Sequence, residues 1–168
     1  MIEVREVVTD QEWQDYLGIR HVVFVQEQHV PEEIEVDAYE EEATHFIAFL
    51  EGKAAGTGRF RLKDSFVKFE RVATLKEFRG KGIASALMDF MEKRAKMKHP
   101  QYLPFMHAQV DAISFYEKRG WEGVGEVFQE GGISHQWMVL IPKSLKGLRC
   151  LEDPKTPEVI KRYIIYQK

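Results

Sequence analysis

Two glycines separated by a single residue stand between an expected strand and an apolar helix, and this arrangement restricts the fold more than any other segment. The turn reads Arg79-Gly80-Lys81-Gly82-Ile83-Ala84-Ser85. Glycine permits unusual backbone dihedrals and the close approach of a ligand. The first amides of a helix lack intrahelical partners, and the helix dipole is positive at that end. The turn therefore indicates an anion site at the start of a helix expected over residues 82–98.

The turn matches neither of two common phosphate-binding motifs. A Walker loop has four residues between its glycines and ends in Gly-Lys-Ser/Thr, and both features are missing. The dinucleotide-binding motif needs a third glycine where Ser85 stands. Taken by itself, the segment is equally consistent with a helix that simply follows a surface turn.

Hydrophobic periodicity places the other elements around this turn. Strands are expected over residues 2–8, 44–50, 54–62, 66–74, 102–110, 121–129 and 133–141, and helices over 10–28, 82–98 and 111–119. Asp10 and Asp111 are the expected N-caps of the first and third helices. Glu51-Gly52-Lys53 is the expected hairpin turn. The order β-α-β-β-β-α-β-α-β-β predicts an α/β fold in which helices cover a sheet.

The length of 168 residues suits one domain, which we place at residues 1–142. Residues 143–168 are then a C-terminal extension with a short amphipathic helix. Thr156 is expected to cap this helix, with Pro157 at its first position. Its apolar stripe must dock on this domain or on a second subunit, which leaves a homodimer open: Val159, Ile160, Tyr163 and Ile164.

Charge and composition exclude several classes of function. The net charge of −3 predicts no general affinity for nucleic acid or anionic membranes. No apolar run approaches the roughly 18 residues that span a bilayer, and the first residues do not resemble a signal peptide. Cys150 is the only cysteine, so neither a disulfide nor a thiolate metal cluster is expected. We therefore expect a cytoplasmic protein without a metal.

Two motifs resemble the GNAT superfamily of N-acetyltransferases. The phosphate-binding signature of that family, Gln/Arg-x-x-Gly-x-Gly/Ala, matches at Arg79, Gly82 and Ala84. Residues 112–121 look like its Ala-x-x-Phe-Tyr-x-x-x-Gly-Phe helix, with Trp121 in place of the last Phe. The resemblance covers about residues 2–141 and implies a GNAT fold with a mixed, mostly antiparallel central sheet. The chain looks closest to the ElaA-like and YjcF-like bacterial branch through residues 23–28, 44–46, 125–128 and 132–135.

The resemblance implies acetyl-CoA as the cosubstrate. Its pyrophosphate is expected on the glycine turn, and its pantetheine arm is expected to pair with the end of the strand 66–74. Backbone amides there would hold the arm and polarise the acetyl carbonyl. The expected cofactor-binding residues are Val72, Ala73, Thr74, Arg79, Gly80, Lys81, Gly82, Ile83, Ala84 and Ser85.

Tyr116 and Glu70 are the catalytic candidates. Tyr116 matches the family tyrosine beside the thioester sulfur, where a phenol protonates the leaving thiolate or orients the sulfur. The alternative is a buried aromatic that only packs. Glu70 shares a strand face with Val72 and resembles the carboxylate that some members use to accept a proton from the amine. A solvated surface carboxylate is the alternative.

His107, Gln109 and His135 are the candidates for contact with the acceptor substrate. Histidine titrates near neutral pH, although a single strand histidine is more often structural, and the same alternatives hold for His45. Gln109 stands where many relatives carry Asn. The segment 32–42 is acidic without a basic residue, and it is either a solvated loop or the border of a cleft that attracts a cationic amine.

The sequence thus predicts an acetyl-CoA-dependent N-acetyltransferase that acts on the primary amine of a small molecule by direct attack on the thioester. A non-catalytic acyl-CoA sensor or interaction module on the same fold is the main alternative. A plain scaffold whose turn binds nothing is the third.

Overall fold

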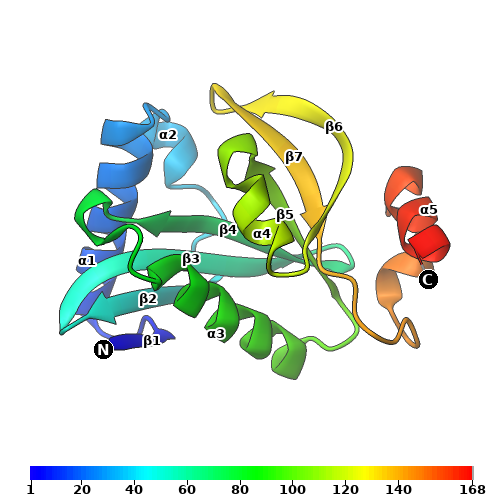
Figure 1. The fold of residues 1–168 in the computed structure, drawn as a ribbon, viewed down its shortest axis with the longest axis horizontal. Helices are drawn as coiled ribbons and strands as arrows, with labels where there is room; N and C mark the ends of the chain where they lie inside the picture. The colour runs from blue at the N-terminus through cyan, green and yellow to red at the C-terminus, as the bar shows by residue number, and fades with distance from the viewer. Residues whose placement is uncertain (168) are drawn as a thin grey trace. The chain divides into compact units, whose positions relative to one another are not determined.

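The computed structural model describes residues 1–167 and contains one sheet of mixed direction (Figure 1). The strands hydrogen-bond in the order β1-β2-β3-β4-β5-β7-β6. β4 and β5 pair in parallel, whereas β1–β2, β2–β3, β5–β7 and β6–β7 are antiparallel. The predicted α/β fold with a mostly antiparallel sheet is confirmed. The strands are β1 (Ile2–Glu6), β2 (Thr44–Leu50), β3 (Lys53–Lys63), β4 (Phe66–Thr74), β5 (Leu103–Gln109), β6 (Glu122–Glu130) and β7 (Ile133–Val139).

The chain forms two compact units, which are described in turn. The first holds residues 1–61 and 70–94, and the second holds residues 62–69 and the chain from residue 95 onward. None of the helices in the described chain is long and apolar enough to cross a bilayer.

The first helix of the first unit changes its winding halfway along. It runs as α1 (Asp10–Arg20) and continues as a π-helix, η1 (His21–Glu27), so the predicted extent was correct but the change of winding was not foreseen. The prediction that Asp10 is the N-cap was wrong, because the N-cap is Thr9. Thr9 accepts a hydrogen bond from the amide of Glu12, and Glu12 accepts one from the amide of Thr9. This reciprocal pair satisfies two otherwise unpaired amides and fixes the helix start.

A two-residue turn joins β2 to β3, as the sequence predicted. Glu51 and Gly52 both have positive φ, at +48° and +79°, which matches the twist of a tight hairpin. The acidic segment expected as an irregular loop contains one helical turn, α2 (Glu32–Glu35).

Glycines in β3 let the long helix α3 (Ile83–Lys98) pack directly on the sheet (Figure 1). A Cβ on Gly56 would lie 2.7 Å from Ile83 Cγ2 and 3.0 Å from Leu87 Cδ1. Any side chain at Gly56 would therefore push the helix away. Ile83, Leu87 and Met91 are all buried, so this side of α3 packs inward.

The second unit is built on β5, β7, β6 and the first half of β4. A 3₁₀ turn, η3 (Val110–Ala112), precedes α4 (Ile113–Glu117). Asp111 was wrong as a cap, because the 3₁₀ turn takes up that residue and Ala112 stands at the N-cap without a side-chain hydrogen bond. Trp121 follows α4 and is buried, with its ring 5.3 Å from that of Phe69.

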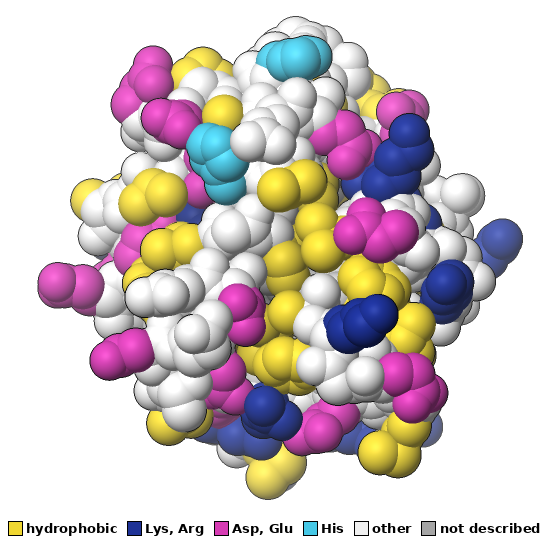
Figure 2. Space-filling view, turned by 90° about the vertical axis from the view of Figure 1, so that its left-hand side faces the viewer, with side chains coloured by type: hydrophobic (Ala, Val, Ile, Leu, Met, Phe, Trp, Pro, Cys, Tyr) yellow, Lys and Arg dark blue, Asp and Glu magenta, His cyan; other side chains and the backbone are white. Residues whose placement is uncertain are grey.

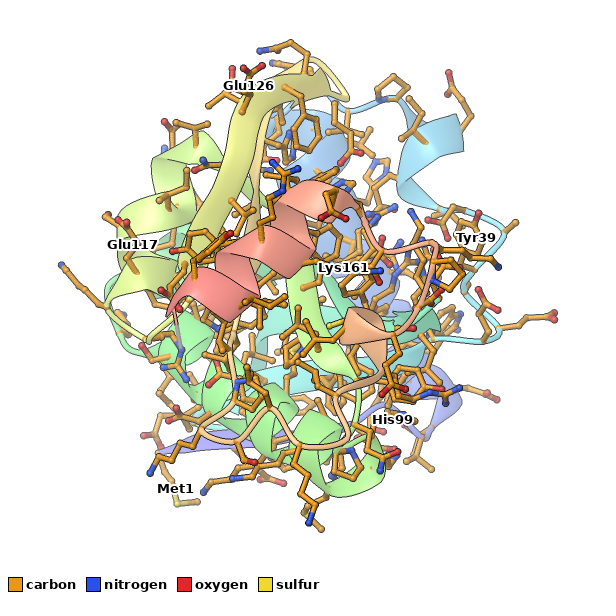
Figure 3. All side chains as sticks on the ribbon, turned by 90° about the vertical axis from the view of Figure 1, so that its right-hand side faces the viewer. Met1, Tyr39, His99, Glu117, Glu126 and Lys161 are labelled. Carbon is orange, nitrogen blue, oxygen red and sulfur yellow. The ribbon has the colours of Figure 1, made fainter. Side chains whose placement is uncertain are left out.

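The C-terminal extension packs on this second unit through α5 (Glu158–Gln167), which faces the viewer in Figure 3. Thr156 was wrong as the cap of α5, since its buried hydroxyl has no hydrogen-bond partner in the described chain and the carbonyl of Pro157 receives the first helical amides instead. Two residues of the predicted apolar stripe, Ile160 and Ile164, are fully buried. They belong to a core cluster with Phe66, Leu103, Phe105, Val124, Val139, Leu148 and Cys150.

Candidate active site

The glycine turn has the geometry that its sequence predicts. Gly80 and Gly82 have φ of +77° and +89°, values that residues with a side chain rarely adopt. No atom lies within 4 Å of the position of a Cβ on Gly80, so the backbone there is openly accessible. α3 begins at Ile83, and the first amides of a helix have no intrahelical acceptor. Lys81 is exposed beside them. The turn therefore presents amides, a helix dipole and one ammonium group to solvent.

Arg79 does not extend freely from the turn. Its Nη1 and Nη2 lie 2.7 Å and 2.8 Å from the two carboxylate oxygens of Glu27, and its Nε donates to the carbonyl of Thr74 at 3.0 Å. The pair raises the pKa of Arg79 and lowers the pKa of Glu27. Arg79 thus ties the end of η1 to the end of β4, a role that its place in the motif did not reveal.

The strand expected to hold the pantetheine arm is irregular at Arg71. This residue has φ of +58° in the middle of β4, and its carbonyl accepts a hydrogen bond from Thr57 Oγ1 at 2.9 Å. Such a dihedral costs on the order of 1–3 kcal/mol and persists only where surrounding contacts fix it. Here Arg71 donates from Nε and Nη2 to the carbonyl of Glu35 and from Nη2 to Asp37 Oδ2. The segment that follows α2 therefore holds this irregular point of β4.

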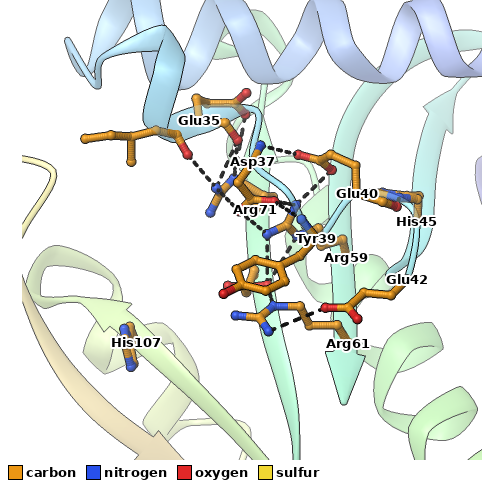
Figure 4. A network of polar contacts seen from close by, with 12 residues as sticks. Glu35, Asp37, Tyr39, Glu40, Glu42, His45, Arg59, Arg61, Arg71 and His107 are labelled. Carbon is orange, nitrogen blue, oxygen red and sulfur yellow. Dashed lines mark hydrogen bonds and ion pairs between the residues drawn. The ribbon is translucent and has the colours of Figure 1, made fainter. Parts of the chain in front are cut away.

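A connected cluster of ion pairs occupies the interior of the first unit (Figure 4). Arg20 and Arg59 are fully buried. Arg20 Nε lies 2.6 Å from a carboxylate oxygen of Glu35, and Arg59 Nη2 lies 2.7 Å from Asp37 Oδ2. Burial opposes these two positive charges, but the surrounding carboxylates outweigh it and raise the pKa of both arginines. The cluster comprises Arg20, Arg59, Arg61, Arg71, Glu35, Asp37, Glu40 and Glu70.

This cluster changes the meaning of the acidic segment 32–42. Its carboxylates Glu35, Asp37 and Glu40 are partners of buried guanidinium groups, whereas Glu41 and Glu42 are exposed. Burial alone would raise the pKa of Glu40, but hydrogen bonds and attraction from Arg20 outweigh it and lower the pKa to about 2. Neither a solvated loop nor a cation-attracting border describes these three carboxylates.

Glu70 belongs to the same cluster. Its Oε1 accepts hydrogen bonds from Arg59 Nη2 at 3.0 Å and from Arg61 Nε at 2.9 Å, and its side chain is 9% exposed. Uptake of a proton by Glu70 would weaken both ion pairs. Its environment therefore opposes the proton-accepting role expected from the sequence, and that role stays a prediction.

His45 is a structural residue. Its Nε2 lies 2.7 Å from the carbonyl of Glu40, which can only accept, so Nδ1 accepts from the hydroxyl of Tyr16 at 2.7 Å. Burial lowers the pKa of His45, which favours the neutral imidazole that this arrangement needs.

Tyr116 is buried in the second unit. Its ring centre lies 5.1 Å from that of Phe115 and 6.3 Å from that of Trp121. Burial raises the pKa of Tyr116 to about 12, so its phenol carries a proton at neutral pH. A phenol in that state can donate a proton and cannot act as a base.

The predicted substrate residues share one face of β5 and β7. Gln109 pairs in register with His135, and His107 lies two residues before Gln109. Phe128 packs between the two histidines, with ring distances of 5.1 Å to His107 and 5.9 Å to His135. Nδ1 of His135 lies 2.7 Å from the carbonyl of Ile133, which can only accept, so Nδ1 is the donor.

Glu130 lies on the same face, although only its position in an expected turn could be predicted from the sequence. Its carboxylate lies 3.0 Å from His107 Nδ1. The hydrogen bond from His107 lowers the pKa of Glu130 to about 2, although burial opposes the shift. The pairing joins residues 23 positions apart, and only the folded sheet brings them together.

The predicted site residues therefore fall into two sets. The first unit contains Glu70, the strand end 72–74 and the turn 79–85, and the second unit contains Tyr116, His107, Gln109 and His135. In the described chain, no group of three or more histidine, cysteine, aspartate or glutamate side chains is arranged to hold a metal ion.

Comparison with known proteins places this chain among acetyltransferases. Residues 6–142 match the family described as acetyltransferase (GNAT) domain. The chain is 35% identical over 131 residues to an uncharacterized N-acetyltransferase, YjcF, of Bacillus subtilis, an alignment that covers 77% of this chain and 93% of YjcF.

Two solved structures share the fold. The Escherichia coli protein ElaA superposes with a TM-score of 0.74 at 23% identity, over 83% of this chain and 99% of ElaA. An acyl-CoA N-acyltransferase from Pseudomonas aeruginosa superposes with a TM-score of 0.73 at 25% identity, over 83% of this chain and 97% of that protein. The residues after 142 lie outside the family match.

Proposed function

The chain belongs to the GNAT family of acetyltransferases and is an acyltransferase, and on that premise we propose that it transfers acetyl from acetyl-CoA to the primary amine of a small molecule. One observation carries the choice of cosubstrate: two glycines with positive φ stand immediately before the start of α3. The backbone there is accessible, and a helix of 16 residues aligns its dipole on the turn. These features fit a pyrophosphate.

The turn and the strand before it would hold the cosubstrate. Amides of residues 82–85 and the ammonium of Lys81 would bind the pyrophosphate, with Arg79 fixing the turn through Glu27 and Thr74. The strand end 72–74 would pair with the pantetheine arm. Acetyl-CoA supplies the acetyl group as a thioester.

Tyr116 is the proposed acid for the departing thiolate. Its raised pKa keeps the phenol protonated at neutral pH, as a proton donor requires. Glu70 remains the proposed base, although its two arginine partners oppose that role. We propose His107, Gln109 and His135 as the residues that contact the acceptor, because they share one face of adjacent strands.

Two measurements test the proposal in sequence. Acetyl-CoA at 100 times its Kd should add about 2.7 kcal/mol to the free energy of unfolding, and no stabilisation would mean that the turn binds nothing. Thiol release from acetyl-CoA is then followed across a panel of primary amines. Stabilisation without thiol release for any amine would favour the alternative, a non-catalytic acyl-CoA sensor.

Location and assembly are proposals of the same kind. We infer a cytoplasmic enzyme, in agreement with the need for acetyl-CoA. A homodimer that used α5 would do so through its outward side chains, Val159, Ile165 and Tyr166, because Ile160 and Ile164 pack inside the unit.

A further inference from the structure

Arg71 has a strained backbone within the strand that is proposed to hold the pantetheine arm. Its φ of +58° lies in the left-handed region, which a residue with a side chain seldom adopts. An irregular residue of this kind interrupts the ladder of a strand and redirects the groups beside it. Such residues persist only where surrounding contacts fix them, and they cluster at active sites. The backbone groups next to Arg71 are therefore candidates for contact with a ligand.

The peptide between Arg71 and Val72 is fixed at its carbonyl end. The carbonyl of Arg71 accepts a hydrogen bond at 2.9 Å from Thr57 Oγ1 on the neighbouring strand β3, and Thr57 is fully buried. In a planar trans peptide the N–H points in the direction opposite to the carbonyl. The N–H of Val72 therefore points away from Thr57.

The edge of β4 that faces away from β3 has room for a ligand beyond Phe69. The ladder between β4 and β5 runs from the pair Phe66–Leu103 to the pair Phe69–Met106. Residues 70–74 continue β4 past the end of this ladder. The N–H of Val72 is thus placed to donate to a molecule that lies along this edge, where the pantetheine arm is proposed.

Contacts with the segment 34–37 hold Arg71 in its conformation (Figure 4). Its Nε and Nη2 lie 3.1 Å and 2.9 Å from the carbonyl oxygen of Glu35. Nη2 also donates to the carbonyl of Ile34 at 3.2 Å and to Asp37 Oδ2 at 3.1 Å. A planar guanidinium fixes several acceptors in one geometry, which the single ammonium group of lysine does not reproduce. The segment 34–37 therefore sets the dihedral of a residue in a distant strand.

The charge of Arg71 is spent on these contacts and is hardly available to a substrate. Figure 2 shows the face of the molecule that carries α1, where hydrophobic, acidic and histidine side chains reach the surface. Arg71 adds little to any surface, because its side chain is 19% exposed. Burial lowers the pKa of Arg71, and the charges of Arg59 and Arg20 lower it further. A guanidinium held against this opposition acts through the geometry that it fixes.

Given the proposed transfer from acetyl-CoA, on which this inference rests, we propose that Arg71 is a positioning residue for activation of the thioester. It holds the N–H of Val72 in the direction from which it donates to the carbonyl oxygen of the bound acetyl group. Negative charge develops on this oxygen when the amine attacks, and a donor that is already oriented stabilises it. The segment 34–37 thereby acts on the reaction through Arg71.

The carbonyl stretch of bound acetyl-CoA reports this hydrogen bond directly. Acetyl-CoA labelled with ¹³C at the thioester carbonyl is bound to the full chain without an acceptor amine, and its infrared band is compared with that of free acetyl-CoA. We expect the wild type to lower the frequency, because a hydrogen bond to the oxygen weakens the C=O bond. Arg71→Lys should lose at least about half of this lowering, and its kcat should fall at least about tenfold. Its Kd for acetyl-CoA should stay within about threefold of the wild type.

Thr57→Val tests the same peptide from its other end. Valine has the shape of threonine without the hydroxyl that holds the carbonyl of Arg71. We expect a similar loss of the frequency shift, which Thr57→Ser should restore. Arg61→Lys is the matched control, because Arg61 Nε donates to the carboxylate of Glu70 in the same ionic cluster and not to the backbone of segment 34–37. It should keep the wild-type frequency.

An unchanged carbonyl frequency in Arg71→Lys would overturn the proposal, and where that variant does not fold, an unchanged frequency in Thr57→Val decides in the same way. An equal change in Arg61→Lys would also overturn it, since the effect would then belong to the whole cluster. A wild type that binds acetyl-CoA without a frequency shift would refute the role of Arg71 and leave the proposed cosubstrate intact. Failure of the wild type to bind acetyl-CoA would instead contradict the proposed function itself.

Discussion

The carboxylate of Glu27 accepts hydrogen bonds from both terminal guanidinium nitrogens of Arg79. This contact joins the last residue of a π-helix to the turn that precedes α3. The side chains are 41% and 38% exposed for Arg79 and Glu27, so the pair contributes little to stability. The Arg79–Glu27 pair matters because it lies beside the glycine turn. It sets the charge that surrounds the proposed pyrophosphate site.

Removal of Arg79 alone should harm cofactor binding more than removal of the pair. Arg79→Ala leaves the Glu27 carboxylate unpaired beside the anion site, so we expect acetyl-CoA to bind at least about tenfold more weakly. The double variant Arg79→Ala/Glu27→Ala removes that repulsion and should recover about threefold or more. Calorimetric titration measures both. A double variant as weak as the single one would show that Glu27 has no electrostatic effect on the site.

A side chain at Gly82 should strain the turn. Its φ of +89° places a Cβ in a strained conformation, at a cost of about 1–2 kcal/mol for Gly82→Ala. We expect lower stability by denaturant unfolding and weaker binding of acetyl-CoA. Gly18→Ala is the matched control, because Gly18 lies inside α1 and alanine should stabilise it.

Tyr116→Phe should separate turnover from binding. The substitution keeps the buried ring and removes the proton, so thiol release should fall at least about tenfold while the Kd of acetyl-CoA changes by less than about twofold. Steady-state kinetics and calorimetry give the two numbers. Equal losses in both would assign Tyr116 a packing role. Because its pKa lies at about 12, ionisation of Tyr116 should leave activity unchanged between about pH 7 and pH 10.

Glu70→Gln and Glu40→Gln form a matched pair within one ionic cluster. Each removes one carboxylate partner of the buried Arg59, which keeps two others, so each should lose about 1–3 kcal/mol of stability. If Glu70 is the base, only Glu70→Gln should abolish the rise of activity with pH, and activity should return with acceptor amines of lower pKa. The same pH profile in both variants would remove Glu70 from catalysis.

Acid should unfold the protein through Glu40 among others. The pKa of Glu40 is about 2 in the folded protein, below its ordinary value of 4.5, so this carboxylate stabilises the fold above about pH 5. That contribution, about 3 kcal/mol, is lost as the pH falls from about 5 to 2. Denaturant unfolding across this range should show a shallower loss in Glu40→Gln. An equally steep loss would mean that Glu40 does not contribute.

Local sequence patterns predicted the helices, strands and turns. Contacts between distant segments determined the caps and the partners of the charged side chains. The glycine turn and the Glu51-Gly52 hairpin need particular dihedrals, and few residues other than glycine supply them, so both were predictable. The cap at Thr9 was missed because aspartate is the more common N-cap, whereas here the hydrogen bond between the Glu12 carboxylate and the amide of Thr9 selects Thr9.

The site was predictable only in part, for the same reason. Arg71, inside a strand, reads as an ordinary solvated side chain, yet its positive φ is fixed by a carbonyl 36 residues away. The partners of Arg20 and Arg59 and the His107–Glu130 pair likewise exist only after folding. We found no local sequence pattern that predicts the change from α to π winding at His21.

The burial of Ile160 and Ile164 shows that the folded core extends beyond the segment that matches the family. The family match ends at residue 142, and 93% of YjcF aligns to only 77% of the sequence. Yet these two side chains complete the same core as Leu103 and Val139. A segment outside the family match therefore completes a core inside it, so removal of the residues after 142 would expose apolar side chains of that core to water.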